Sequence, residues 1–176
     1  MSLEPYRNQL LDTAFPCSAK APVTGQLVCI LDARSAKRGL ELVSFPSRAV
    51  LKHEVHELIL TAEPSAAPGQ RVDRITYLAY FEVSTSGVLW VGDRVRIAGR
   101  EIGALAGYDL THFPNHMNII IKTDADLYTG HEAGFVPGAP IEFVFPGRPA
   151  EGKTMSAKIK VAVMGCGHIG KSAIQA

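Results

Sequence analysis

The sequence has few cysteines, no long apolar run and no secretory signal. It contains only three cysteines in 176 residues, Cys17, Cys29 and Cys166, too few and too scattered for the disulfide framework of a small secreted protein. Cys29 lies in an apolar run and is predicted to be a buried, unreactive thiol. No apolar run reaches the roughly 20 residues that cross a bilayer, and the first residues lack the basic flank and apolar core of a secretory signal. We therefore expect a cytoplasmic protein.

An excess of charge is also missing. Eighteen lysines and arginines face 17 aspartates and glutamates, for a net charge of +1. Such a chain has no overall field that would attract nucleic acid or an anionic membrane, so we expect neither as a partner. The local basic group of Arg34, Lys37 and Arg38 is interpreted as a solvated turn. The hydrophobic share of 47% and the charged share of 20% are those of an ordinary globular domain.

Short apolar segments separated by glycine and proline turns dominate the chain. Their alternation predicts strands near 23–31, 40–45, 75–83, 88–91, 102–106, 117–122 and 141–145. Short strands at regular intervals favour a mainly β fold, a small antiparallel β-barrel, because closure removes exposed edges. The aromatic residues Tyr77, Tyr80, Phe81 and Trp90 are assigned to its core.

One or two short helices are expected beside the strands. Ser2 is a suitable N-cap, Pro5 fits the first turn, and Pro16 would end a helix begun there. In residues 47–62, Leu51, Val55 and Leu58 follow helical spacing, which favours a second helix.

The domain is predicted to cover residues 1–146, followed by a linker at 147–154 and a C-terminal extension at 155–176. The extension runs from an apolar strand into Gly165-Cys166-Gly167-His168-Ile169-Gly170. It resembles the N-terminal start of a Rossmann-type NAD(P)-dependent dehydrogenase, which implies a turn that receives a dinucleotide pyrophosphate.

Six residues follow this turn, with no second strand and no ribose-binding acid, so we expect no NAD(P) binding by this chain alone. Three interpretations stay open. The extension is a run into a downstream dehydrogenase reading frame, an extra strand that caps the barrel, or a phosphate site that a partner chain completes.

The densest polar cluster lies in residues 108–118, between two strands, where a rigid scaffold can present a functional loop. Its histidines and nearby carboxylate are ligand types for a divalent metal, with one position left open for chemistry. The alternatives are small-ligand binding, or a purely structural turn in which polar side chains bond local amides. The candidate residues are Asp109, Thr111, His112, Asn115 and His116.

A second cluster is His53-Glu54-Val55-His56-Glu57. On a helix, His53, His56 and Glu57 would share one face, whereas on a strand only His53 and Glu57 would do so. The cluster is either a solvated polar face or the part of the molecule that approaches the loop and completes its site, with His53 and Glu57 as ligand-binding residues.

Two functions follow from these patterns, and the sequence leaves open whether the protein is an enzyme. In the first, the barrel binds or transforms a small molecule, and His112 or His116 acts as a metal ligand or a general base. In the second, the protein is a non-catalytic accessory or assembly protein that associates with a dehydrogenase or with further copies of itself, and the extension serves as a docking strand.

Overall fold

A computed structural model describes residue 8 and residues 17–147 of the chain. Within that range the secondary structure consists of strands and no helix, which confirms the prediction of a mainly β fold. The long strands are β1 (Val23–Ser35), β4 (Val55–Thr61), β6 (Ile75–Val83), β8 (Arg94–Ile97), β9 (Arg100–Asp109), β10 (Asn118–Lys122) and β11 (Pro140–Val144). The short ones are β2 (Leu40–Glu41), β3 (Ser47–Val50), β5 (Arg71–Val72) and β7 (Gly87–Trp90).

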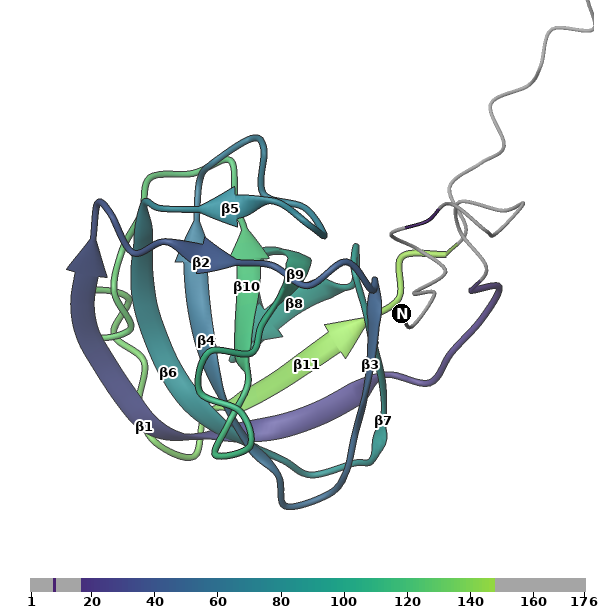
Figure 1. The fold of residues 1–176 in the computed structure, drawn as a ribbon. Helices are drawn as coiled ribbons and strands as arrows, with labels where there is room; N and C mark the ends of the chain where they lie inside the picture. The colour runs from purple at the N-terminus through teal and green to yellow at the C-terminus, as the bar shows by residue number, and fades with distance from the viewer. Residues whose placement is uncertain (1–7, 9–16, 148–176) are drawn as a thin grey trace, which may run out of the picture.

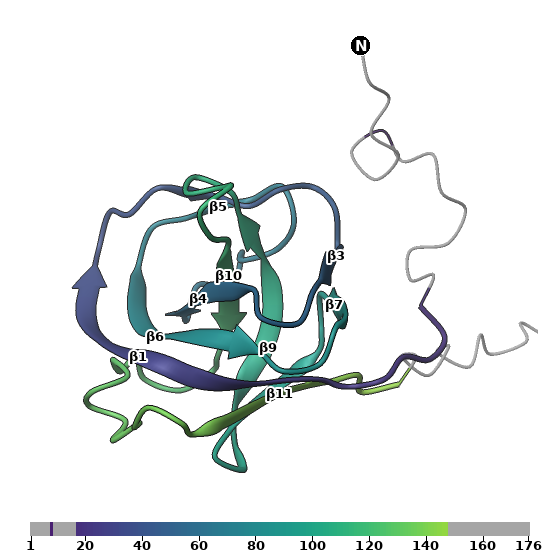
Figure 2. The same ribbon diagram turned by 90° about the horizontal axis from the view of Figure 1, so that it is seen from below.

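Seven strands form one sheet in the order β1-β11-β8-β9-β10-β4-β6, and β6 pairs back with β1, so that the sheet closes. The ring of strands is visible in two perpendicular views (Figures 1 and 2). Six of the seven pairings are antiparallel, and β10 pairs with β4 in parallel. That parallel contact joins the two segments that carry the polar clusters of the sequence.

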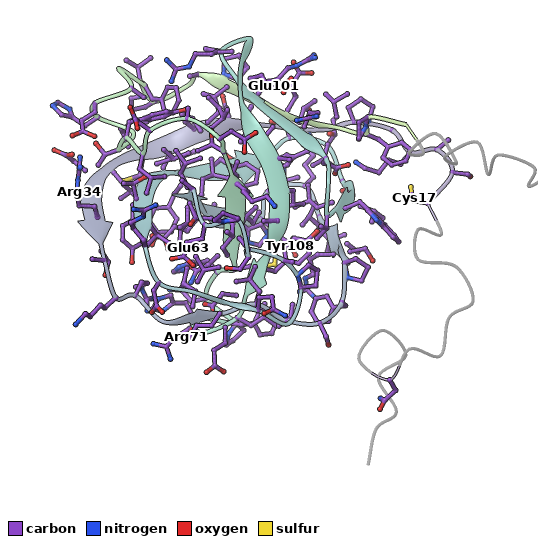
Figure 3. The ribbon with its side chains drawn as sticks, turned by 90° about the horizontal axis from the view of Figure 1, so that it is seen from above. Cys17, Arg34, Glu63, Arg71, Glu101 and Tyr108 are labelled. Carbon is purple, nitrogen blue, oxygen red and sulfur yellow. The ribbon has the colours of Figure 1, made fainter. Side chains whose placement is uncertain are left out.

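The interior of the ring holds the main core. Large apolar side chains from nearly every strand pack there, and Tyr108 is among those with no exposed surface. Figure 3 shows Tyr108 in the middle of the domain. Lys20, just before β1, places its ammonium 2.8 Å from the carboxylate of Asp93, whose side chain has no exposed surface. The N-terminal segment is thereby tied to the turn between β7 and β8.

A β-bulge in β6 changes which of its side chains face inward. Consecutive residues of β4 pair with Ala79 and Tyr77, so Leu78 between them has no partner. After the bulge, Phe81 packs in the interior, whereas Tyr77 packs against a second apolar cluster. A simple alternation places Tyr77 and Phe81 on the same side. The assignment of both tyrosines of β6 to the core was wrong: Tyr77 packs against the second cluster, and Tyr80 is half-buried and pairs with Glu57.

The second apolar cluster lies under the two-stranded sheet of β2 and β5. Leu42, which follows β2, packs so closely on Gly107 of β9 that an added Cβ at that glycine would collide with it. This contact holds the β2 segment close against the outer face of the sheet.

The predicted helix over residues 47–62 is wrong. Its two ends are β3 and β4, joined by a tight turn at residues 51–54. The reason is tertiary: Leu58 and Leu60 face the interior while Ile59 faces the outer cluster, so β4 is apolar on both sides and shows no alternation. The strand expected at 40–45 is only Leu40–Glu41.

The expected N-terminal helix between Ser2 and Pro16, apart from residue 8, and the dehydrogenase-like extension at 155–176 lie outside the described residues. Within the described part, no helix has the length and hydrophobicity needed to cross a membrane.

Candidate functional site

A row of polar side chains crosses five neighbouring strands on the outer face of the sheet. Cys29 of β1 pairs with Tyr80 of β6, and Tyr80 pairs with Glu57 of β4. Glu57 pairs with Asn118 of β10, which pairs with Asp109 of β9. Directly paired residues project to the same side of a sheet. The register therefore brings together residues of both polar clusters.

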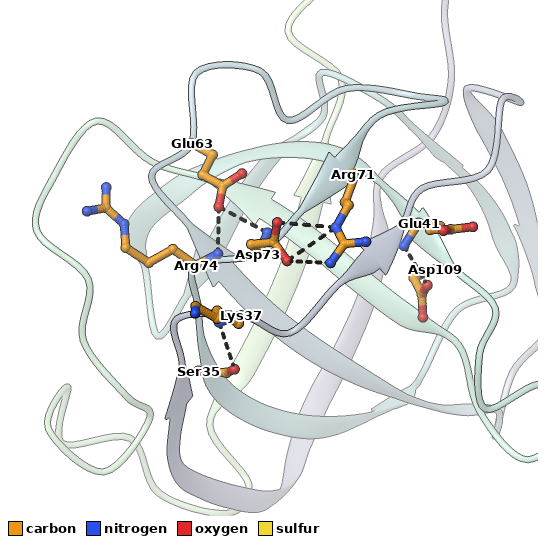
Figure 4. Close-up of polar contacts among 8 residues, drawn as sticks. All are labelled: Ser35, Lys37, Glu41, Glu63, Arg71, Asp73, Arg74 and Asp109. Atoms are coloured by element: carbon orange, nitrogen blue, oxygen red, sulfur yellow. Dashed lines mark hydrogen bonds and ion pairs between the residues drawn. The ribbon is translucent and has the colours of Figure 1, made fainter.

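Asp109 ends this row in a structural role. Its carboxylate accepts hydrogen bonds from the Thr111 amide (3.1 Å), the Thr111 hydroxyl (3.0 Å) and the Asn118 side-chain amide (2.9 Å). A fourth comes from the backbone amide of Glu41 in β2, at 3.1 Å (Figure 4). With 2% of its surface exposed, Asp109 joins the loop, β10 and the outer β2 segment.

The centre of the row is formed by Glu57, Tyr80 and His116. Nε2 of His116 lies 3.9 Å from the Glu57 carboxylate and 3.5 Å from the Tyr80 hydroxyl. The imidazole also packs edge-on against the Tyr80 ring, with centroids 5.1 Å apart. Both partners of this contact are largely buried, since the side chains of His116 and Glu57 are 11% and 8% exposed.

Burial shifts the proton affinities of this group. It lowers the pKa of His116 below 6.5, an effect that the Glu57 charge opposes and the neighbouring His112 reinforces. Burial, followed by the charge of Glu57, raises the pKa of Tyr80 to about 12. At neutral pH the site therefore holds a neutral imidazole and a neutral phenol beside a carboxylate.

His112 extends the site toward the turn after β1. Its ring stacks on that of His116, with centroids 5.0 Å apart. The guanidinium of Arg38 donates from Nη2 to Nε2 of His112 (3.2 Å) and from Nε to the Tyr77 hydroxyl (2.8 Å). Arg38 was expected in a solvated turn, but it is half-buried and bridges Tyr77 of β6 and His112 of the loop before β10.

Three of these side chains help to line an open cavity of about 270 Å³. Its walls are formed by Leu31, Ala33, Glu57, Tyr77 and His112. Larger hollows exist, one of about 640 Å³ beside β2 and β5 and one of about 390 Å³ near the end of β1. Neither of these two is lined by a histidine. Of the three cavities, the one of about 270 Å³ is lined by a buried carboxylate, an imidazole and a phenol together.

The remaining predicted residues lie outside this cavity. His53 is 69% exposed and pairs with Glu82, with Nδ1 2.6 Å from the carboxylate. Thr111 and Asn115 are exposed; Thr111 bonds Asp109, and the Asn115 backbone amide bonds the carbonyl of His112. His53, Thr111 and Asn115 therefore do not line the site.

His56 is a structural histidine. Its Nδ1 accepts a hydrogen bond from the Met117 amide at 3.3 Å, so the proton of the neutral ring is on Nε2, which faces Glu54 at 3.3 Å. Burial lowers its pKa. His56 thus attaches β4 to the residue that precedes β10, beside the parallel pairing.

The predicted metal group of Asp109, His112 and His116 does not assemble. Asp109 is committed to four donors, and Nε2 of His112 faces a guanidinium. Among residues 8 and 17–147, no three or more histidine, cysteine, aspartate and glutamate side chains are placed to share a metal ion.

Sequence reasoning missed Tyr80, Tyr77 and Arg38. The tyrosines follow a strand pattern that the bulge interrupts, and Arg38 reaches the site through a turn whose path no local pattern encodes. Cys29 was expected in the core and is instead exposed on the outer face, because a register shift separates it from Leu27.

Comparison with known proteins gives one match. Residues 17–144 match the model of a family of unknown function (DUF6917). No curated protein and no solved structure matches the chain.

Proposed function

The chain belongs to the DUF6917 family of unknown function, and we propose that it is a small-molecule-binding protein whose site is the cavity beside Glu57, His112 and His116. The domain is a small barrel that carries this site on its outer face, where β1, β6, β4 and the loop before β10 meet. The single observation that carries the proposal is the buried pairing of Glu57 with His116, 3.9 Å apart at the edge of that cavity.

A buried carboxylate costs free energy unless it has a compensating partner. His116 compensates Glu57 only when protonated, and its lowered pKa keeps the ring largely neutral at pH 7. Buried ionisable groups with shifted pKa values are concentrated at sites that bind or transform a ligand.

The same arrangement suits proton transfer. A neutral imidazole beside a carboxylate can accept a proton from a bound molecule, and Glu57 then stabilises the imidazolium that forms. His116 is the candidate general base of such a step, and the Tyr80 hydroxyl lies 3.5 Å from its Nε2.

The test uses a matched pair of variants in a screen of small polar metabolites by thermal shift and calorimetry. Glu57→Gln removes the buried charge of the site, and Glu82→Gln removes the carboxylate of the exposed His53 pair. Ligands of the site should lose at least tenfold in affinity with Glu57→Gln and keep their affinity with Glu82→Gln. Equal effects of the two variants, or no ligand for the native chain, would refute the proposal.

The second candidate is an accessory protein of a dehydrogenase, acting through the C-terminal extension. It rests on the resemblance in residues 155–176, which lie outside the described part of the chain. Removal of residues 153–176 distinguishes the candidates: cavity ligands still bind under the first, and oligomerisation or partner capture is lost under the second.

A further inference from the structure

Arg38 carries a positive charge that no carboxylate of the described residues neutralises. Its two hydrogen-bond partners are the Tyr77 hydroxyl and Nε2 of His112, and neither carries a negative charge. They fix the guanidinium against two residues that line the cavity, while other N–H groups of the fork remain available. A guanidinium held in place by groups without a negative charge is prepared to bind a carboxylate in a bidentate manner.

Glu57 carries the opposite charge and lines the cavity itself. Within the described residues, no lysine or arginine lies within 4.0 Å of it, and its ion-pair partner is the imidazole of His116, 3.9 Å away. Glu57 and Arg38 do not pair with each other. The cavity therefore has the Glu57 carboxylate on its wall and the Arg38 guanidinium bonded to two of its lining residues, Tyr77 and His112. Neither charge has a permanent counter-ion among the described residues.

The remaining walls, Leu31, Ala33 and the Tyr77 ring, are mainly apolar. A volume of about 270 Å³ is slightly below the range of pockets for drug-sized ligands. It suits a molecule of few heavy atoms with a short apolar body. Such a molecule would satisfy both charges if it carried an ammonium group at one end and a carboxylate at the other.

We infer that the cavity binds a small zwitterionic amino acid, with its carboxylate on Arg38 and its ammonium group on Glu57. This inference rests on the proposed function, because it names the ligand class of the same site. His116 then lies beside the ammonium group, and His112 lies between the two charged ends.

The experiment is isothermal titration of the full chain with the twenty L-amino acids, β-alanine and γ-aminobutyrate. Each amino acid that binds is compared with its amide, which lacks the carboxylate, and with the corresponding hydroxy acid, which lacks the ammonium group. We expect both analogues to bind at least tenfold more weakly than the amino acid. Arg38→Gln should lower the affinity for the amino acid at least tenfold and leave the weak affinity for the amide unchanged.

Arg34→Gln is the matched control, because Arg34 is an exposed arginine of the same segment that pairs with Glu132. It should leave amino-acid affinity unaltered. If Arg38→Gln fails to fold, the comparison of the three ligand types on the native chain still decides the matter.

Several results would overturn the inference. If the amide or the hydroxy acid binds as tightly as the amino acid, one of the two charge contacts is not made. Failure of every amino acid, while other metabolites bind in a Glu57-dependent manner, would overturn the inference and leave the proposed function standing. If no compound of any class binds, both fail.

Discussion

Glu57 in β4 and His116 just before β10 meet with 3.9 Å between carboxylate oxygen and imidazole Nε2. The contact depends on the parallel pairing of β4 with β10, in which Glu57 stands opposite Asn118. His56 reinforces the same junction by accepting a hydrogen bond from the Met117 amide. The fold thus assembles the site from two segments far apart in the chain.

The first prediction concerns proton binding by His116. Its pKa should lie below 6.5, because burial outweighs the attraction of Glu57. Glu57→Gln removes the attraction and should lower this pKa further, whereas His112→Ala removes a neighbour that lowers it and should raise it. NMR titration that resolves each histidine measures the His116 pKa in the native chain and in both variants. A shift of the His116 pKa upward in Glu57→Gln would contradict the described geometry.

Stability should decrease as the pH falls below about 6.5, the ordinary histidine value. His56 and His116 both have lowered pKa values in the folded state, so the unfolded chain binds more protons in this range. Urea unfolding at pH 7.5 and 5.5 measures the loss. His116→Gln should reduce the loss, while His53→Ala, at an exposed position, should keep it. A pH-independent free energy of unfolding would be the contrary result.

Asp109→Ala should destabilise the domain by more than about 2 kcal/mol, since each buried donor left unpaired costs about 1–3 kcal/mol. The variant removes the acceptor of four hydrogen bonds, including the one from the outer β2 segment. Denaturant unfolding gives the value. Asp124→Ala, an exposed aspartate near the end of β10, is the control and should change stability by less than about 0.5 kcal/mol. Comparable effects of the two would show that Asp109 does not join these elements.

Lys20→Met should destabilise the protein by about 3–5 kcal/mol, because it leaves the buried carboxylate of Asp93 without its cation. A second change, Asp93→Leu, made in the Lys20→Met background should recover part of the loss. Unfolding free energies of the four proteins form a double-mutant cycle. Additive effects, with no coupling energy between the two positions, would show that the ion pair does not stabilise the domain.

The sequence predicted the elements whose physics is local. The isoleucines of 119–121 and the alternation in 75–83 identified β10 and β6 within a residue or two. It failed at 47–62, because β4 is apolar on both faces and its leucines happen to follow helical spacing. A strand covered on both sides has no alternation to detect.

Of the candidate site, local patterns identified His112, His116 and Glu57, because polar residues were concentrated in two short segments. They could not identify Tyr80 or Arg38. The position of Tyr80 depends on register across β1, β4 and β6, and on the bulge at Leu78. The role of Arg38 depends on the path of a turn, and the commitment of Asp109 depends on the distant amide of Glu41.

The most direct test is the imidazole NMR spectrum of the full chain, recorded with and without each ligand found by screening. The account predicts that a bound ligand shifts the signals of His112 and His116 and leaves those of His53 in place. A ligand that shifts His53 alone, or that binds without moving His112 and His116, would show that the site lies elsewhere.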